Sequence, residues 1–69
     1  MSEITYHLPE MHCGACEASV RKALAALTGV QDVAVDLPRR LVGVRYDESR
    51  TEAPAIRERI QRAGFEVSG

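Results

Sequence analysis

The residues best suited to chemistry are Cys13 and Cys16, the only two cysteines in a chain of 69 residues. They are three positions apart, just after a strand-like run and just before an amphipathic segment. Partial positive charge and free N–H groups at the start of a helix favour the thiolate, which is the form that binds a metal ion. The same pair could also act as a redox dithiol. The spacing therefore leaves two chemistries open, the binding of a soft metal ion and thiol–disulfide exchange.

The small number of other donors limits which metal ion this pair suits. Structural zinc sites usually offer four side chains, and beyond the cysteines the chain has only His7 and His12, with Glu10 as a nearby acid. We expect His7 to lie on the solvent side of its strand and His12 to point outward, as a candidate third ligand. Cu(I) accepts two or three soft ligands and is selected by thiolates. Cu(I) is therefore the favoured ion, with Zn(II) and Hg(II) as alternatives.

Hydrophobic periodicity predicts the elements that position the cysteines. Apolar residues alternate along some segments, as in half-buried strands, and recur every three to four residues along others, as in helices. The second helix is expected to have Thr51 or Glu52 as its cap and Pro54 in its first turn, and Gly29 and Gly64 are expected to follow the two helices. In chain order the expected elements are a strand over 4–8, a helix over 16–27, a hairpin of strands over 33–37 and 41–46, a helix over 53–63 and a short strand from Phe65.

This order of elements predicts an α+β domain of the ferredoxin-like type, βαββαβ. Two helices would cover one face of a four-stranded antiparallel sheet. The length leaves room for a single domain, residues 1–69, with a lean core, because a chain this short buries only about 60% of its unfolded surface. In this topology the loop after the first strand and the loop before the last strand share one end of the domain. Cys13 and Phe65 are therefore expected to be near neighbours.

Composition and charge argue against several classes of function. Nine basic and ten acidic residues give a net charge of −1, which provides no electrostatic case for nucleic acid as a partner. No stretch reaches the roughly 20 apolar residues that cross a bilayer, and we find no secretory signal, so we expect a cytoplasmic protein without membrane insertion. Thiols stay reduced in the cytosol, where a close cysteine pair is more often metal-binding or catalytic than structural.

A resemblance to a known family follows from the cysteine motif and from two further segments. Residues 11–16, Met-His-Cys-Gly-Ala-Cys, match the Met-x-Cys-x-x-Cys signature of the heavy-metal-associated (HMA) domain family. Residues 33–44 look like the central hairpin of that family, and residues 63–67, Ala-Gly-Phe-Glu-Val, look like its ending. The resemblance covers nearly the whole chain.

The resemblance implies a role for each residue of the site. Cys13 and Cys16 would be the metal ligands, and Met11 would be a buried anchor under the loop rather than a ligand. Phe65 would lie beside the site as a hydrophobic shield. Phe65 has no hydroxyl or ammonium group, so it offers the metal neither a hydrogen bond nor a neutralising charge.

The family includes copper chaperones, the amino-terminal domains of metal-exporting P-type ATPases, and mercury-binding proteins, so the resemblance implies a metal carrier and not an enzyme. The predicted function is a metallochaperone that binds one Cu(I) and passes it by thiolate exchange to a metal-transporting P-type ATPase or its soluble metal-binding domain. We expect a monomer that a shared metal ion can bridge into a dimer, with Arg21 and Lys22 as the preferred docking residues.

Three alternatives remain at this point. A Zn(II) or Hg(II) carrier of the same family would use the same loop. A thiol–disulfide oxidoreductase would use the same cysteine pair, although such proteins are longer and the chain has neither a tryptophan before the pair nor a proline within it. A regulatory domain that belongs to a transporter is the third alternative.

Overall fold

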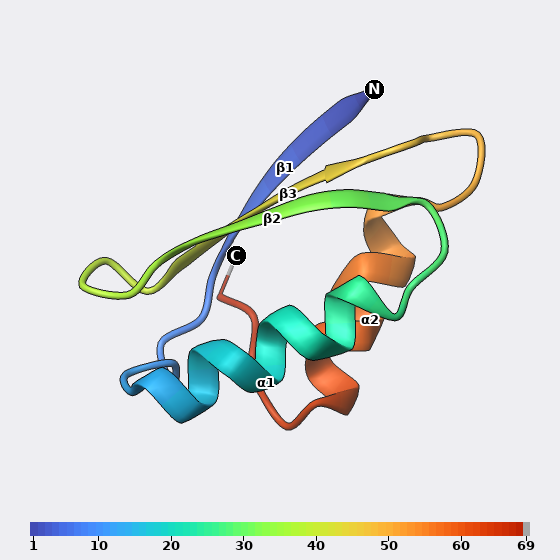
Figure 1. Cartoon of the computed structure of the whole chain (residues 1–69). Helices are drawn as coiled ribbons and strands as arrows, with labels where there is room; N and C mark the ends of the chain where they lie inside the picture. Colours follow the sequence, from blue (N-terminus) through green and yellow to red (C-terminus); the bar gives the residue numbers. More distant parts are fainter. Residues whose placement is uncertain (69) are drawn as a thin grey trace.

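A computed structural model of the chain describes residues 1–68 and shows two helices on one face of an antiparallel sheet (Figure 1). In chain order the elements are β1 (Ser2–His7), α1 (Gly14–Ala25), β2 (Val30–Asp36), β3 (Leu41–Tyr46) and α2 (Ala53–Arg62). The strands lie in the order β1-β3-β2, so β3 is the central strand. The α+β, ferredoxin-like arrangement predicted from the sequence is confirmed.

The predicted last strand differs from the structure. Residues 65–68 make only an isolated antiparallel bridge, from Ser68 to His7, so the sheet in the described part of the chain has three strands instead of four. The N–H groups of this segment explain the difference. The N–H of Phe65 donates to the carbonyl of Ile60 in α2 (3.4 Å). The N–H of Glu66 donates to the carboxylate of Glu10 (3.3 Å), and the N–H of Ser68 donates to the carbonyl of His7 (2.8 Å). The pairing with β1 is therefore limited to the bridge at Ser68, because the N–H groups of residues 65 and 66 are engaged elsewhere.

The core lies between the sheet and the two helices. Val42 and Val44 alternate along β3 and are fully buried, and each helix contributes two buried residues that are four positions apart. Full burial of one such side chain stabilises the fold by about 1.5–3 kcal/mol. The buried apolar residues are Tyr6, Leu8, Met11, Val20, Leu24, Val42, Val44, Ile56 and Ile60.

The helix bounds differ slightly from the predicted ones: α1 lies two residues earlier than the predicted 16–27, and α2 ends one residue before the predicted 53–63. Glu52 is the residue before α2, Pro54 lies in its first turn, and Gly64 follows with a φ of 99°. Gly29, which leads into β2, also has a φ of 99°, and a Cβ atom there would lie 2.9 Å from the Cβ of Arg50. Only glycine fits this position without strain. Neither helix within residues 1–68 is long and apolar enough to span a bilayer.

β2 is an edge strand, and a side chain from α1 covers part of its outer edge. The Nη1 atom of Arg21 donates to the backbone carbonyl of Val33 (2.9 Å), and its Nε atom donates to Glu17 (3.0 Å). Because Glu17 lies one helical turn earlier, this ion pair orients the guanidinium toward the strand. Arg21, which we expected to be available for a partner, is therefore engaged within the molecule.

Candidate metal centre

The loop between β1 and α1 has a buried base. Leu8 and Met11 are both fully buried, and the N–H of Met11 donates to the carbonyl of Leu8 (3.0 Å), which closes a tight turn. The N–H of Leu8 donates in turn to the carbonyl of Arg40, in the turn between β2 and β3 (2.8 Å). The loop is thus fixed to the core at its base, while the motif that follows is largely exposed.

Cys13 is the N-cap of α1. Its backbone is extended (φ −143°, ψ 162°), and its sulfur accepts a hydrogen bond from the N–H of Cys16 at 3.3 Å. Serine, threonine, aspartate and asparagine usually take this position, because a side-chain acceptor satisfies one of the free N–H groups at the helix start. Here a thiol does so. The sequence correctly placed Cys13 just before the helix and Cys16 in its first turn.

The two thiols lie close together and affect each other's ionisation. Both cysteines are free, and their sulfur atoms are 2.9 Å apart and hydrogen-bonded. Hydrogen bonds from the side chain and the N–H of Cys16 lower the pKa of Cys13. Donation to Cys13, together with partial burial, raises the pKa of Cys16. The first proton is therefore lost from Cys13, and the pair holds its negative charge on the more exposed sulfur.

His12 lies closer to the thiols than the sequence suggested. It is exposed, as expected, but a nitrogen of its ring and the two cysteine sulfurs all lie within 4.8 Å of one another. Among the described residues, this is the group of three potential metal donors that the fold brings together. Glu10 is engaged with the N–H of Glu66, and His7 lies exposed on β1.

The spacing of the two sulfurs requires a small rearrangement before one ion can bind between them. At a typical metal–sulfur distance of about 2.3 Å, two sulfurs lie about 4.0 Å apart in a trigonal site and about 4.6 Å apart in a linear one. The sulfurs of Cys13 and Cys16 are 2.9 Å apart. They must therefore separate by roughly 1–2 Å. Rotation of the exposed side chain of Cys13 can supply this movement without a change in the core.

Phe65 is half-buried and packs against the core. Its neighbour Glu66 is bonded to Glu10, three positions before Cys13, and Pro9 lines one shallow depression together with Phe65. The structure thus connects the segment after α2 with the entry to the cysteine loop. The role of Phe65 as a shield for the metal stays a prediction.

No sequence pattern singles out Arg40, which the structure shows at the base of the loop. Besides its carbonyl contact with Leu8, its Nη1 atom donates to the carbonyl of Pro9 at 3.0 Å. A contact across 31 positions, between a turn and a loop, has no periodic signal in the sequence.

These features define a class of protein: a small α+β domain that presents two free thiols and an imidazole at the start of its first helix. The sequence model of the heavy-metal-associated domain family matches residues 5–66, and the chain belongs to that family. It is a metal-binding domain similar to copper chaperones.

The chain is similar both to free-standing chaperones and to parts of transporters. It is 40% identical over 57 residues to the copper chaperone CopZ of Staphylococcus haemolyticus, a match that covers 83% of this chain and 84% of the chaperone. It is 37% identical over 65 residues to a copper-exporting P-type ATPase of Bacillus subtilis, where the match covers 94% of this chain but only 8% of the ATPase. A solved structure of a CopZ metallochaperone superposes with a TM-score of 0.93, at 30% identity, over 97% of this chain and 100% of the other.

Proposed function

We propose that this domain binds one Cu(I) ion through Cys13 and Cys16 and passes it to a partner protein. The observation that best supports this proposal is the pair of free thiols, 2.9 Å apart, that opens α1. Soft thiolates select Cu(I), and two or three ligands suffice for it. The names of the similar proteins, a copper chaperone and a copper-exporting ATPase, support the same ion.

Transfer proceeds by exchange of ligands, with no change of oxidation state. A thiolate of the partner forms a bond to Cu(I), which becomes three-coordinate, and the bond to Cys13 then breaks and releases its sulfur as a thiolate. Cys13 leaves before Cys16 because it is exposed, whereas Cys16 is half-buried against the core. A second exchange at Cys16 completes the transfer.

In this proposal His12 is a reserve donor, which binds the ion only while it is attached to one of the two cysteines. Its ring nitrogen is already within 4.8 Å of both sulfurs, so a modest movement of exposed side chains brings it to the ion. An imidazole holds the ion while a thiolate is exchanged. It also makes the site more acceptable to Zn(II), because imidazole suits zinc as well as copper.

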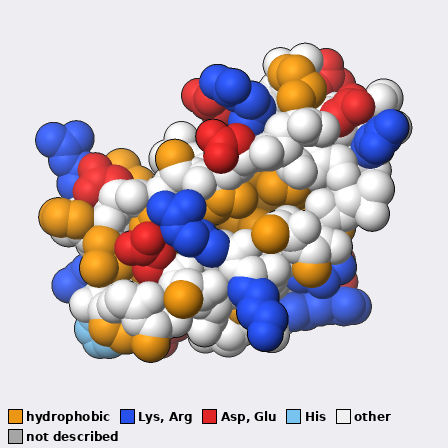
Figure 2. All heavy atoms as spheres, viewed as in Figure 1, with side chains coloured by type: hydrophobic (Ala, Val, Ile, Leu, Met, Phe, Trp, Pro, Cys, Tyr) orange, Lys and Arg blue, Asp and Glu red, His pale blue; other side chains and the backbone are white. Residues whose placement is uncertain are grey.

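The partner in this proposal is a metal-transporting P-type ATPase or its metal-binding domain, and the transfer takes place in the cytoplasm. Figure 2 shows acidic and basic side chains intermixed over much of the face that it presents, with basic groups adjoining at its lower right. Lys22, an exposed residue in the last turn of α1, has no ion pair among the described residues and is the cation we assign to docking. Contacts of this kind set the association rate and the choice of partner more than the affinity.

The first experiment is an anaerobic titration of the reduced protein with Cu(I) and Zn(II) against chelators of known affinity. The proposal predicts tight one-to-one Cu(I) binding and weaker Zn(II) binding. His12→Asn should weaken Zn(II) binding more than Cu(I) binding. His7→Asn is the matched control, because His7 is equally exposed but lies outside the donor group.

Each other outcome contradicts the proposal in a distinct way. Zn(II) binding as tight as Cu(I) binding would point to a zinc carrier. Weak binding of both ions, with tight Hg(II) binding, would point to a mercury carrier. Weak binding of all three, with a dithiol that reduces protein disulfides, would point to an oxidoreductase.

A further inference from the structure

The turn between β2 and β3 contains a residue in a conformation that its type does not favour. Arg40 has a φ of 59°, the left-handed region, and it is the one non-glycine residue with positive φ among residues 1–68. Glycine and asparagine are the usual choices there, because glycine has no Cβ to clash with the backbone and the short polar side chain of asparagine can form a local hydrogen bond. The turn itself needs only the backbone of this residue, whose N–H donates to the carbonyl of Leu37 at 3.1 Å. The hairpin therefore gives no reason for an arginine.

The side chain of Arg40 supplies that reason, because it holds the base of the cysteine loop. Its Nη1 atom donates to the carbonyl of Pro9 (3.0 Å), and its own carbonyl accepts the N–H of Leu8 (2.8 Å). Two consecutive residues of the loop entry are thus bound by one residue of the turn. The carbonyl of Leu8 then accepts the N–H of Met11 (3.0 Å), so the contact leads directly to the start of the metal-binding motif.

We propose that Arg40 is a positioning residue for metal binding, which keeps the base of the loop fixed while the exposed thiols move. This inference rests on the proposed function of the loop. The sulfurs must separate to admit an ion, and a fixed base confines that movement to side chains. Backbone strain held at one position by surrounding contacts is typical of sites that need preorganisation. Without the guanidinium, the entry segment opens more often and a bound ion leaves faster.

The test compares Arg40→Asn with Arg39→Asn. Asparagine tolerates the left-handed conformation, so Arg40→Asn keeps the turn and removes only the contact with Pro9. Arg39 belongs to the same turn and carries the same charge, but its side chain is 79% exposed and pairs only with Asp36 at 3.8 Å. The two variants therefore lose the same charge, and only one loses the contact with the loop.

The first measurement is amide hydrogen exchange in the metal-free protein, read by NMR at Leu8 and Met11. Loss of one hydrogen bond should raise the exchange rate at Met11 by about fivefold to tenfold in Arg40→Asn. Arg39→Asn should exchange like the parent. The melting temperature, measured in parallel, shows whether a global loss of stability causes the change.

The second measurement is the rate at which a high-affinity chelator removes Cu(I) from the loaded protein. Arg40→Asn should lose the ion several times faster than Arg39→Asn. Equal exchange and equal removal rates in the two variants would overturn the role of Arg40. If the parent protein binds no Cu(I), the proposed function fails, but the exchange experiment still tests the contact. Faster exchange at Met11 with an unchanged removal rate would also overturn the proposal, because the contact would then be structural only.

Discussion

Two loops at opposite ends of the β1–β3 ladder both contain a side chain that accepts hydrogen bonds from a residue shortly after it in the sequence, but the two loops differ in what surrounds that side chain. Residues 47–52 follow the end of β3 that pairs with the start of β1, and residues 8–13 follow the end of β1 that pairs with the start of β3. In each loop a side-chain acceptor is held by a residue two or three positions later. The difference lies in whether the groups around that acceptor are themselves potential ligands.

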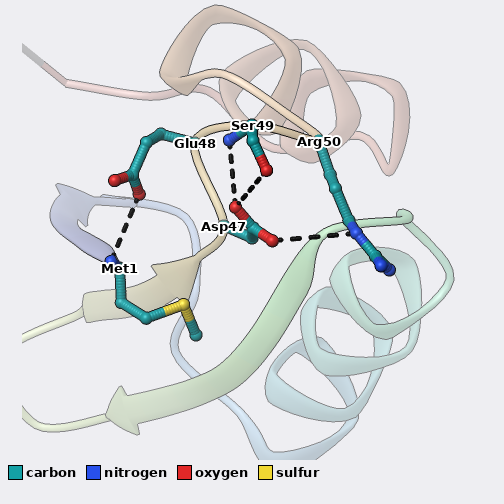
Figure 3. Close-up of polar contacts among 5 residues, drawn as sticks. All are labelled: Met1, Asp47, Glu48, Ser49 and Arg50. Atoms are coloured by element: carbon teal, nitrogen blue, oxygen red, sulfur yellow. Dashed lines mark hydrogen bonds and ion pairs between the residues drawn. The ribbon is translucent and has the colours of Figure 1, made fainter.

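In the 47–52 loop the acceptor is the carboxylate of Asp47, and both of its oxygens have partners within the loop. Asp47 accepts hydrogen bonds from the hydroxyl (2.6 Å) and the N–H (3.0 Å) of Ser49 and lies 3.7 Å from the guanidinium of Arg50 (Figure 3). The bonds from Ser49 lower the pKa of Asp47. The N-terminal ammonium of Met1 pairs with Glu48 beside it (3.5 Å). This loop is complete by itself.

In the cysteine loop the acceptor is the sulfur of Cys13, and its partner is a second thiol, that of Cys16. The hydrogen bonds from Cys16 lower the pKa of Cys13, as those from Ser49 do for Asp47. Cys16 can lose its proton and become a ligand, which the hydroxyl of Ser49 does not do near neutral pH. The comparison shows a local side-chain acceptor used in two ways: at Asp47 its partners are a hydroxyl and a guanidinium, whereas at Cys13 its partner is a second thiol that could itself bind a soft ion.

The largest effect is expected from removing a thiol. Cys13→Ala or Cys16→Ala should weaken Cu(I) binding by about a hundredfold to a thousandfold, one ligand's share of a typical structural-site affinity. Ser49→Ala, the equivalent change in the other loop, should leave Cu(I) binding unchanged. Competition titration measures all three. Full affinity in both cysteine variants would remove the distinction between the loops.

The next effect concerns the apolar base of the cysteine loop. Met11→Ala should lower the free energy of unfolding by about 2–5 kcal/mol, because Met11 is fully buried and a cavity would remain. Met11→Leu, which nearly conserves volume, should cost less than about 1.5 kcal/mol. Urea unfolding of the metal-free proteins measures both. A loss in Met11→Ala no greater than that in Met11→Leu would mean that the base of the loop is not anchored by packing.

A smaller effect is expected at the start of α2, where Tyr6 of β1 donates a hydrogen bond to the carbonyl of Ala53 (2.9 Å). Tyr6→Phe should cost about 1 kcal/mol, which corresponds to a fall of about 4–8 °C in melting temperature. Cu(I) affinity should stay the same, because the contact holds α2 rather than the cysteine loop.

The pH dependence of this contact has a definite sign. Burial raises the pKa of Tyr6, with a smaller contribution from Tyr46, so the native state favours the neutral phenol. Its contribution is complete below the unfolded pKa of about 10 and is lost as the pH rises through the higher native value. The parent protein should therefore lose stability above about pH 10 more steeply than Tyr6→Phe. Parallel curves for the two proteins would contradict this.

The smallest expected effect is a difference in reactivity between the two thiols, Cys13 and Cys16. Because the pKa of Cys13 is lowered and that of Cys16 is raised, iodoacetamide should alkylate Cys13 first near neutral pH. Peptide mass spectrometry of briefly treated, metal-free protein gives the ratio, which should be severalfold. In denaturant the two rates should become equal. Preferential reaction at Cys16 in the folded protein would reverse the assignment of the charge.

The parts of this protein that are predictable from sequence are those set by short-range pattern and burial. Val42 and Val44 alternate because one face of a strand meets the helices, and Val20 and Leu24 are one turn apart because one face of α1 meets the sheet. The cysteine pair is recognisable because its chemistry depends on two residues three positions apart.

The parts that were not predictable depend on single side chains that reach across the fold. The carboxylate of Glu10 takes a donor that a fourth strand would need, and Arg40 reaches back 31 positions to Pro9. His12 was a candidate third ligand from its position beside Cys13, but the approach of its ring to within 4.8 Å of both sulfurs was not predictable from that position. Contacts of this kind do not recur at a regular spacing along the sequence, so hydrophobic periodicity does not predict them.

The contact of Arg21 with the carbonyl of Val33 has a consequence for crowded conditions. An open strand edge invites a second chain to extend the sheet, and charged side chains laid over the edge discourage this. With that carbonyl occupied, two copies that collide along β2 find one hydrogen-bond position already filled. Encounters between molecules are thereby less able to end in lasting strand pairing along β2.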